Sequence, residues 1–382
     1  MRSSKQLKIG FPYVGDRFGG SNMSSLVMAG GLQALGHDVV VATHGGGRAA
    51  DEAAARGLRT VALPALSTAP GYSRPDKARW DNILALRHCA RFMREQQLDI
   101  IHTNDLTMLR TWALPAVATG KTLVAHWRTS SRASLSVSAA LWNARRIISV
   151  SDYSKDILPS WAQRRTIVEF NALESFWNDE QRAIARKAIR QELGFPEDSL
   201  LLGVFGNLTK RKRAHALADI MRDLGPSIGG RPVFGVACGG VIEPRDEELE
   251  PKREAYGLKE RLAVPGFVRP VDRWMAACDV ILAPAEREPL ARNVLEAMAV
   301  GVPVVVSDDG GLREFIKQGD NGFLLAPHDT DQWVRVIRDI LSGQCPAEQL
   351  IRAGQKAASE LTVEKHARRI EKIYFDALTR KA

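Results

Sequence analysis

Residues 281–311, ILAPAEREPLARNVLEAMAVGVPVVVSDDGG, decide the fold of this chain. Apolar, largely β-branched residues at 280–283 and 302–306 predict two buried strands. The segment between them supplies a loop and one helix, and a Gly-Gly turn follows the second strand. Two buried strands joined by a helix are typical of a βαβ unit in a parallel sheet, so we expect an α/β fold.

Two acidic side chains lie near the predicted start of this helix. A residue before proline is disfavoured in the helical region, so we expect Glu288 on the loop and Pro289 as the first helical residue. Glu296 then lies about two turns further on. The helix start offers unpaired N–H groups and a positive dipole end, which together bind anions. Two carboxylates that accept hydrogen bonds from hydroxyls, on either side of a phosphate site, predict a nucleotide-sugar pocket. The alternative is a solvated acidic helix face.

Further motifs accompany this glutamate pair: Glu-Pro-Leu at 288–290, Glu-Ala-Met-Ala at 296–299, Gly-x-Pro-Val-Val at 301–305, Gly-Gly at 310–311, then Glu314 and Asn321-Gly322. Together they resemble the signature of the retaining glycosyltransferases of the GT-B fold, glycosyltransferase family 4, also called glycosyl transferases group 1. The resemblance implies two Rossmann-like, doubly wound α/β domains that face each other across a cleft. It also implies that the second domain holds most of the sugar donor.

The same resemblance assigns roles to individual residues. Glu288 is expected to be catalytic and to face the transferred sugar, while Glu296 is expected to bond the nucleotide ribose. The Gly-Phe-Val segment at 266–268 resembles the family loop that lies over the base. The expected donor-binding residues in this half are therefore Phe267, Val268, Pro289, Leu290, Ala291, Arg292 and Glu296.

A basic loop follows another predicted strand at 201–206. Gly206, Leu208 and Lys212 match the family pattern Gly-Arg-Leu, three residues, Lys-Gly, whereas Asn207 stands where arginine is common. We expect Lys212 to be catalytic and to stabilise the departing diphosphate, with Asn207 also on the donor. Lys210, Arg211 and Arg213 are candidates to replace the missing arginine, and a solvated basic loop is the alternative.

The first half contains weaker signals. Gly19 and Gly20 follow the first predicted strand and match a family Gly-Gly loop, where glycine lets the backbone approach a ligand; an ordinary tight turn is the alternative. We assign Gly20 to the donor and Gly19 to the acceptor. Polar residues at the ends of parallel strands predict acceptor contacts at Asn104 and Asp105, with Arg128 beside them. The resemblance implies that His126 acts on the donor sugar.

Length and pattern predict the domain organisation. A chain of 382 residues suits two domains. We expect an N-terminal acceptor-binding Rossmann-like domain at 1–172 and a C-terminal nucleotide-sugar-binding Rossmann-like domain at 173–360. Apolar residues at helical spacing near the end predict a terminal helix, and the resemblance implies that residues 361–382 pack back on the first domain.

The composition limits the class of protein. No run approaches the roughly 20 apolar residues of a membrane span, and the first residues lack the apolar centre of a signal peptide, so we expect a cytoplasmic protein. Four scattered cysteines show no metal-ligand spacing or pairing, and we expect them to be reduced. We expect no cofactor and no metal site, the nucleoside-diphosphate sugar being a substrate.

The basic residues are concentrated in the first half. Residues 1–172 contain 22 Lys and Arg against 12 Asp and Glu, whereas the remainder contains 31 against 32. This asymmetry indicates either an anionic membrane surface or nucleic acid as a partner, with a merely solvated surface as the alternative. Residues 135–142 predict a helix with Leu and Trp beside Arg132, Arg145 and Arg146, which is typical of a helix on anionic lipid.

The resemblance therefore implies a retaining hexosyltransferase that moves a sugar from a nucleoside diphosphate, such as UDP or GDP, to an acceptor hydroxyl, and we expect it to be metal-independent. Its expected setting is cell-envelope polysaccharide, lipopolysaccharide or glycolipid assembly, on the inner face of the plasma membrane as a peripheral protein. No nucleic-acid module is recognisable, so we expect no nucleic-acid partner. A nucleotide-sugar 2-epimerase of the same fold and a catalytically silent binding or scaffold subunit are the alternatives.

Overall fold

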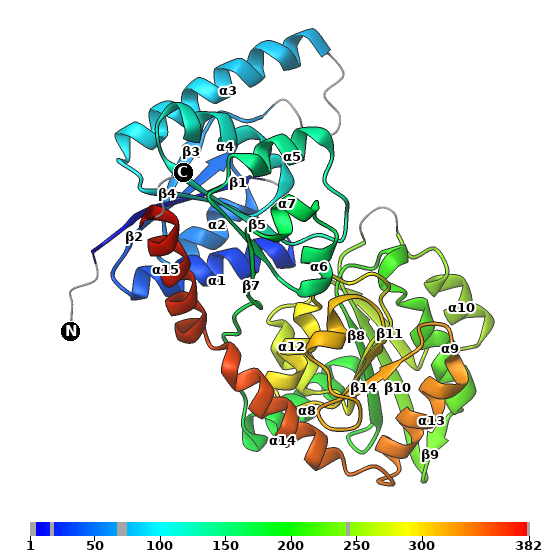
Figure 1. Cartoon of the computed structure of the whole chain (residues 1–382). Helices are drawn as coiled ribbons and strands as arrows, with labels where there is room; N and C mark the ends of the chain where they lie inside the picture. The colour runs from blue at the N-terminus through cyan, green and yellow to red at the C-terminus, as the bar shows by residue number, and fades with distance from the viewer. Residues whose placement is uncertain (1–4, 16–18, 67–74, 242–244, 380–382) are drawn as a thin grey trace. The chain divides into compact units, whose positions relative to one another are not determined.

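The computed structural model describes residues 5–15, 19–66, 75–241 and 245–379, with the backbone alone at 75–84. The chain divides into two compact units (Figure 1). The N-terminal unit consists of Met1–Ala172 and Thr362–Ala382, and the C-terminal unit consists of Leu173–Leu361. The first residue of the C-terminal unit is bonded to its last, because Leu173 donates its N–H to the carbonyl of Leu361 at 2.8 Å.

The N-terminal unit is built on a parallel sheet in the order β3-β2-β1-β4-β5-β6-β7. Its strands are β1 (Lys8–Val14), β2 (Asp38–His44), β3 (Arg59–Leu63), β4 (Ile100–Thr103), β5 (Thr122–Trp127), β6 (Arg146–Ser149) and β7 (Thr166–Val168). Its helices are α1 (Gly20–Ala34), α2 (Arg48–Ala55), α3 (Pro75–Glu95), α4 (Leu106–Ala118), α5 (Leu135–Trp142), α6 (Asp152–Asp156), α7 (Ser160–Gln163) and α15 (Val363–Thr379).

Helix α15, at the red end of the chain in Figure 1, packs against α1 and joins the core of the N-terminal unit. Its apolar face, which includes Ala367, Ile370 and Tyr374, is fully buried. The two helices approach closely at Gly31, where an added Cβ would lie 2.8 Å from the Val363 side chain. A larger residue at position 31 would therefore push the helices apart.

The C-terminal unit is built on a second parallel sheet in the order β11-β10-β8-β12-β13-β14, with β9 antiparallel to β10. Its strands are β8 (Leu200–Phe205), β9 (Ser227–Ile228), β10 (Arg231–Cys238), β11 (Leu262–Gly266), β12 (Val280–Ala283), β13 (Val304–Ser307) and β14 (Phe323–Leu325). Its helical segments are α8 (Asp179–Leu193), η1 (Lys210–Lys212), α9 (His215–Leu224), α10 (Leu249–Ala255), α11 (Val271–Ala276), α12 (Arg292–Ala299), η2 (Gly310–Glu314), α13 (Thr330–Leu341), α14 (Ala347–Ala358) and η3 (Ser359–Leu361).

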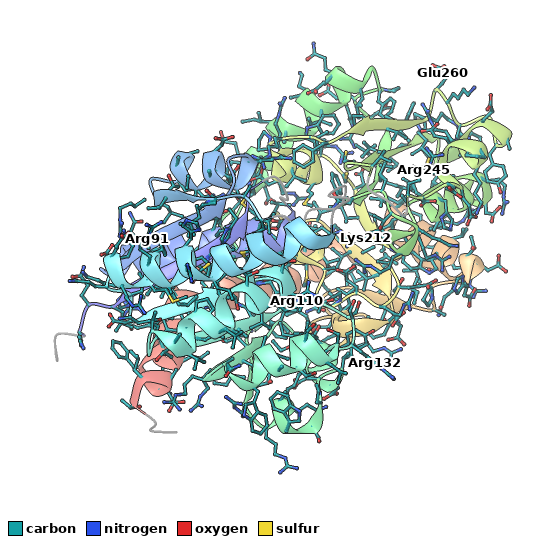
Figure 2. The ribbon with its side chains drawn as sticks, turned by 90° about the horizontal axis from the view of Figure 1, so that it is seen from above. Arg91, Arg110, Arg132, Lys212, Arg245 and Glu260 are labelled. Carbon is teal, nitrogen blue, oxygen red and sulfur yellow. The ribbon has the colours of Figure 1, made fainter. Side chains whose placement is uncertain are left out.

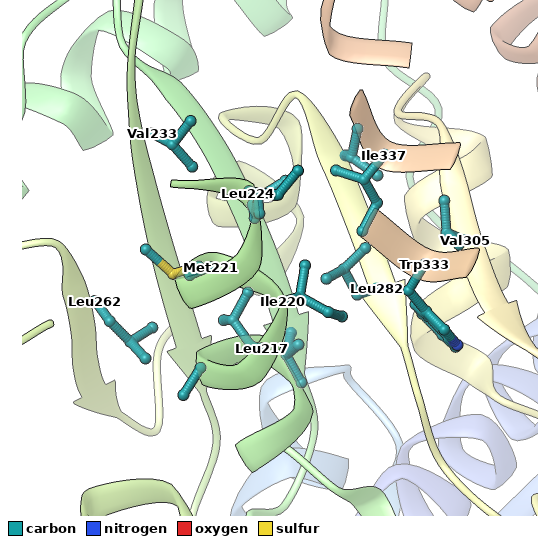
Figure 3. Packing of buried hydrophobic residues seen from close by; sticks show 14 of the residues in the cluster. Leu217, Ile220, Met221, Leu224, Val233, Leu262, Leu282, Val305, Trp333 and Ile337 are labelled. Atoms are coloured by element: carbon teal, nitrogen blue, oxygen red, sulfur yellow. The ribbon is translucent and has the colours of Figure 1, made fainter. Parts of the chain in front are cut away.

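The core of this unit lies between the sheet and helices α9 and α13 (Figure 3). Leu217 and Met221 of α9 are fully buried against the sheet, and Trp333 of α13 is 1% exposed. The Trp333 indole donates to the carbonyl of Ala326 at 2.9 Å, so its one polar group is paired inside the core. This core holds the sheet in place, and the candidate site lies at the carboxyl ends of its strands.

The prediction of two Rossmann-like α/β domains is confirmed. Strand β12 coincides with the predicted strand at 280–283, whereas β13 spans Val304–Ser307 and not 302–306. Gly301 adopts a positive φ of 78° and Val302 donates its N–H to the Ala297 carbonyl, so these residues close the helix before the strand begins.

Each sheet contains one point at which the strand order reverses. In the N-terminal unit it lies between β1 and β4, and in the C-terminal unit between β8 and β12. In open α/β sheets, the connections after the two central strands leave in opposite directions at such a point, which opens a crevice beyond the carboxyl ends of the strands. Ligands of open α/β sheets bind at such points.

Within the described part of the chain, no helix combines the length and the apolar character needed to cross a bilayer.

Candidate active site

A pocket lies at the reversal point of the C-terminal sheet. It is open to solvent. The lining comes from the ends of β8 and β12, the loops after them, and the first turn of α12: Val204, Phe205, Gly206, Asn207, Leu208, Lys212, Ala214, Leu282, Ala283, Pro284, Ala285 and Asn293. The pocket thus brings together Asn207 and Lys212, two residues singled out from the sequence, whereas Glu288 is not among its lining residues.

Contacts from the Gly-Gly turn to the Glu288 backbone hold this residue in place. Gly311 donates its N–H to the Glu288 carbonyl at 2.8 Å. Gly310 has a φ of 72°, and a Cβ at that position would lie 2.2 Å from the Glu288 carbonyl oxygen. Only glycine fits this approach, because a side chain would be both sterically blocked and in an unfavourable conformation. The Gly-Gly turn after β13 therefore sets the position of Glu288.

The Glu288 carboxylate is buried, with 6% of the residue exposed, and two cations share one of its oxygens. Lys212 Nζ lies 2.8 Å and Arg211 Nη1 lies 2.6 Å from Glu288 Oε2. Burial by itself raises the pKa of the Glu288 carboxyl, but the charges and hydrogen bonds of Lys212 and Arg211 outweigh it and lower the pKa. Lys212 and Arg211 are both cations and Glu288 is the one anion between them, so the three side chains together carry a net positive charge.

Arg211 also ties the loop after β8 to the loop after β12. Its guanidinium donates to the Glu286 carbonyl at 3.2 Å, and its own carbonyl accepts from the Glu286 N–H at 3.1 Å. Arg213, with a φ of 53°, turns its side chain to the Glu286 carboxylate at 2.8 Å. Lys210 is exposed. Of the three proposed substitutes for the missing arginine, Arg211 therefore is the one that shares the Glu288 carboxylate with Lys212.

Helix α12 begins at Arg292, so the prediction that Pro289 opens the helix is wrong. A helix starting at Pro289 would use the Glu288 carbonyl for its first turn, but Gly311 occupies that carbonyl. Pro289, Leu290 and Ala291 instead form an irregular connection, with Leu290 and Ala291 buried. Glu296 lies in the second turn of the helix, where its carboxylate accepts from Arg292 Nε at 2.5 Å.

Asn293 is a residue of this site that the sequence analysis missed. Its side-chain amide donates to the Phe205 carbonyl at 2.7 Å and so joins the first turn of α12 to the end of β8. Asparagine is a poor residue for a helix interior, because its side chain competes for backbone hydrogen bonds. That preference is the one signal that could have identified it.

Phe267 and Val268 follow β11 at the edge of the sheet, and neither is among the residues that line the pocket. Phe267 is 55% exposed, and the Arg269 guanidinium lies 5.4 Å from its ring centre. Their assignment to the nucleotide base stays a prediction.

In the N-terminal unit, Gly19 caps α1 and Gly20 is its first residue, while residues 16–18 of the same loop lie outside the described residues. A Cβ at either glycine would meet no atom within 4 Å. Asn104, at the end of β4, donates to the Ser21 carbonyl at 3.0 Å. The Asp105 carboxylate accepts from the Thr107 and Met108 N–H groups and caps α4. Asp105 thus has a structural role that the sequence analysis did not assign.

His126 lies at the end of β5 and is 4% exposed. Its Nδ1 is 3.1 Å from Arg128 Nη2, and Arg128 also donates to the Asn171 side chain. Burial, together with the charge of Arg128, lowers the pKa of His126 well below its usual value, so the ring is neutral. Among the described residues, no group of three or more His, Cys, Asp or Glu side chains is arranged to hold a metal ion.

Comparisons with known proteins agree with this architecture. The family model described as Glycosyl transferases group 1 matches residues 185–357, and the one described as Glycosyltransferase Family 4 matches residues 18–168. The D-inositol 3-phosphate glycosyltransferase of Xylanimonas cellulosilytica is 34% identical over 179 residues, which are 46% of this chain and 42% of that protein. The putative glycosyltransferase EpsD of Bacillus subtilis is 29% identical over 194 residues, 50% of this chain and 49% of that protein.

The chain thus spans about half the length of these curated relatives. Among solved structures, Anabaena HepE in complex with UDP-glucose has a TM-score of 0.80 and 20% identity, covering 97% of this chain and 100% of that chain. This likeness shows the fold. Because the two family models match the greater part of both units, the chain belongs to the family 4, group 1 glycosyltransferases of the GT-B fold.

Proposed function

We propose that this protein transfers a sugar from a nucleoside-diphosphate donor to an acceptor hydroxyl with retention of anomeric configuration. The observation that carries the proposal is the buried Glu288 carboxylate, shared by Lys212 and Arg211 at the reversal point of the C-terminal sheet. Preorganised cations in a partly buried pocket stabilise a departing diphosphate far more than solvated cations would. The UDP-glucose complex of HepE supports a nucleotide sugar as the donor.

Each group in or beside the pocket has a part in this reaction. Lys212 supplies a compact charge, and the planar Arg211 guanidinium, which shares the Glu288 carboxylate with Lys212, supplies the two-point grip that the family arginine would give at position 207. The N–H groups of the first turn of α12 add the positive end of a helix dipole. These groups neutralise the diphosphate, so the proposed reaction needs no divalent ion. Glu288 then orients the sugar, and Glu296 holds the nucleotide ribose.

In the N-terminal unit, we propose that His126 donates a hydrogen bond to the transferred sugar. The acceptor lies near Gly19, Asn104 and Arg128, with Gly20 near the donor. The buried His126 Nε2 has no hydrogen-bond partner among the described residues, which supports a ligand there.

A screen of nucleoside-diphosphate sugars by thermal shift tests the donor, since a ligand that binds the folded state raises the melting temperature. With the donor known, Glu288→Ala and Lys212→Ala are expected to remain folded and to lose about 10²-fold or more in kcat, as when one transition-state donor is removed. Lys210→Ala, in the same turn but exposed, is the matched control. Wild-type turnover in Lys212→Ala would contradict the proposal.

The product of the same reaction distinguishes the alternatives. The anomeric proton coupling of the product measures retention directly. Donor turnover without acceptor, with an epimerised sugar as product, would identify a 2-epimerase instead. Donor binding without any turnover would identify a silent subunit.

We further propose that the N-terminal unit binds an anionic membrane surface, as a peripheral cytoplasmic protein in cell-envelope polysaccharide, lipopolysaccharide or glycolipid assembly. Helices α4 and α5 contact each other and expose Leu114, Val117, Leu135 and Trp142, which are 61%, 56%, 92% and 65% exposed. Residues 106–151 contain six basic residues and no acidic one. Arg110 on α4 and Arg132 before α5 are labelled in Figure 2. Apolar side chains beside basic ones favour adsorption to anionic lipid.

Flotation with vesicles that contain phosphatidylglycerol tests this membrane proposal. The double variant Leu135→Ser, Trp142→Ser is expected to lose binding. Ile184→Ser is the control, because Ile184 is also 65% exposed but lies on α8 in the C-terminal unit. Equal flotation of all three proteins, or flotation that ignores anionic lipid, would contradict it.

A further inference from the structure

Three buried polar rings connect the C-terminal helix to the end of β5. The Tyr374 hydroxyl on α15 lies 2.7 Å from His102 Nδ1 on β4. His102 Nε2 lies 3.1 Å from His126 Nδ1 on β5. Tyr374 and His102 are fully buried, and the His102 ring stacks on Phe11 at 5.1 Å between ring centres. The chain of contacts is therefore continuous and shielded from water.

The three rings carry no charge at neutral pH. Burial, followed by the charge of Arg128 and of His366, lowers the pKa of His102 well below its usual value, and His126 shifts in the same direction for the same causes with His102 added. Burial also raises the pKa of Tyr374 well above its usual value. A neutral imidazole has one N–H and one bare nitrogen, so each histidine must be one of two tautomers.

Arg128 decides which tautomer His126 adopts. A guanidinium can only donate, so the His126 Nδ1 that it contacts at 3.1 Å must be the bare nitrogen. His102 Nε2, at the same distance from that nitrogen, must then be the protonated one. It follows that His102 Nδ1 is bare and accepts from the Tyr374 hydroxyl. Both contacts to His126 Nδ1 are at the long end of the usual range, as expected for two donors that share one lone pair.

The proton of His126 is thereby left on Nε2. This atom is buried and has no hydrogen-bond partner among the residues that the structure describes. Buried N–H groups in native proteins are rarely unpaired, and an unpaired one indicates an unfilled role. The role that the proposed function offers this N–H is to donate to an oxygen atom of a bound substrate.

We propose that Tyr374 and His102 are positioning residues, which with Arg128 hold the His126 ring so that its Nε2–H donates to a substrate oxygen. This inference rests on the proposed sugar-transfer function of His126. It makes α15 part of the active site, although Tyr374 is 272 residues away from His102 in the sequence. Partners that orient a metal-bound histidine typically contribute 10- to 100-fold to metal affinity or activity, and we expect an effect at the lower end of that range, about tenfold, from Tyr374.

Nitrogen NMR of the full chain labelled with ¹⁵N-histidine tests the tautomers without any substrate. His102 and His126 are expected to be neutral Nε2–H tautomers that do not titrate between about pH 6 and about pH 8. Tyr374→Phe is expected to shift the signal of His102 Nδ1, since that nitrogen loses its donor. An Nδ1–H tautomer at His126 would overturn the inference.

Kinetics with the donor identified above test the consequence. Tyr374→Phe is expected to lower kcat about tenfold and to leave the donor KM unchanged. Tyr13→Phe is the matched control, because Tyr13 is also fully buried in the N-terminal unit but donates to Ser25 Oγ at 2.7 Å. His102→Gln keeps an amide N–H at the place of Nε2 and is expected to keep most of kcat, whereas His102→Leu is expected to lose it.

The two tests separate the inference from the proposed function. If wild type shows the predicted tautomers but no transfer, the proton placement stands and the sugar-transfer function fails. If wild type is active and Tyr374→Phe loses stability but no more kcat than Tyr13→Phe does, Tyr374 is only structural and the inference is overturned.

Discussion

The position of Glu288 depends on Gly310, and Gly310→Ala tests this dependence. An added Cβ would lie 2.2 Å from the Glu288 carbonyl oxygen and 2.7 Å from its nitrogen, whereas real Cβ atoms essentially never come closer than 3.0 Å. The Glu288 backbone must therefore move by nearly an ångström, and a displacement of about 1 Å at a catalytic group can lower the rate by roughly 10²-fold. We expect a loss of that order in kcat.

The matched control is Gly319→Ala. Gly319 has the same φ of 72°, but a Cβ there meets nothing within 4 Å. Both variants should lose about 1–2 kcal/mol of unfolding free energy, because a side chain is disfavoured at positive φ, and Gly310→Ala should lose more because its Cβ overlaps the Glu288 backbone. Urea unfolding measures this shared loss, and kcat at saturating donor measures the effect of Glu288 displacement. If Gly310→Ala and Gly319→Ala have the same kcat, Gly310 does not position Glu288 and the reasoning is refuted.

Two further predictions concern charge. Because the pKa of Glu288 is lowered, its carboxylate stabilises the fold above the unfolded pKa of about 4.3, and this stabilisation is lost as the pH falls through the lower folded pKa. The unfolding free energies of wild type and Glu288→Gln should therefore differ more at pH 7 than at pH 3. A difference that stays constant with pH in urea titrations would contradict this. Because Lys212 and Arg211 are proposed to neutralise the diphosphate, transfer should be unchanged after dialysis against a chelator; activity that is lost and then restored by manganese would disprove it.

The sequence was most informative where one local rule acts alone. The apolar run at 280–283 is the strand β12, because a buried parallel strand needs such a run. The helix start was misplaced because Pro289 is a local signal, whereas the competing bond from Gly311 comes from beyond the next strand. Lys210, Arg211 and Arg213 were all candidates to replace the family arginine, and the structure distinguishes them, since Arg213 adopts a positive φ and pairs with Glu286 whereas Arg211 pairs with Glu288.

The N-terminal unit was harder to predict for a related reason. His102 and Tyr374 look like ordinary core residues in a linear pattern, and their contact depends on how α15 packs beside β4 and β5. Asn104 and Asp105 were both placed at the correct strand end, but Asp105 caps α4. Residue spacing identifies a strand end, whereas the partner of each side chain there follows from packing between distant segments.

The central claim is that Lys212 and Arg211 at the reversal point of the C-terminal sheet bind the diphosphate of the donor. Calorimetric titration of the full chain with nucleoside diphosphates, compared between Lys212→Met and the exposed control Lys210→Met, tests it most directly. We expect wild type and Lys210→Met to bind the same nucleoside diphosphate with similar Kd, and Lys212→Met to bind at least about tenfold more weakly, as for a lost charge-assisted bond of roughly 1.5–3 kcal/mol. Equal affinity in all three proteins would contradict the account.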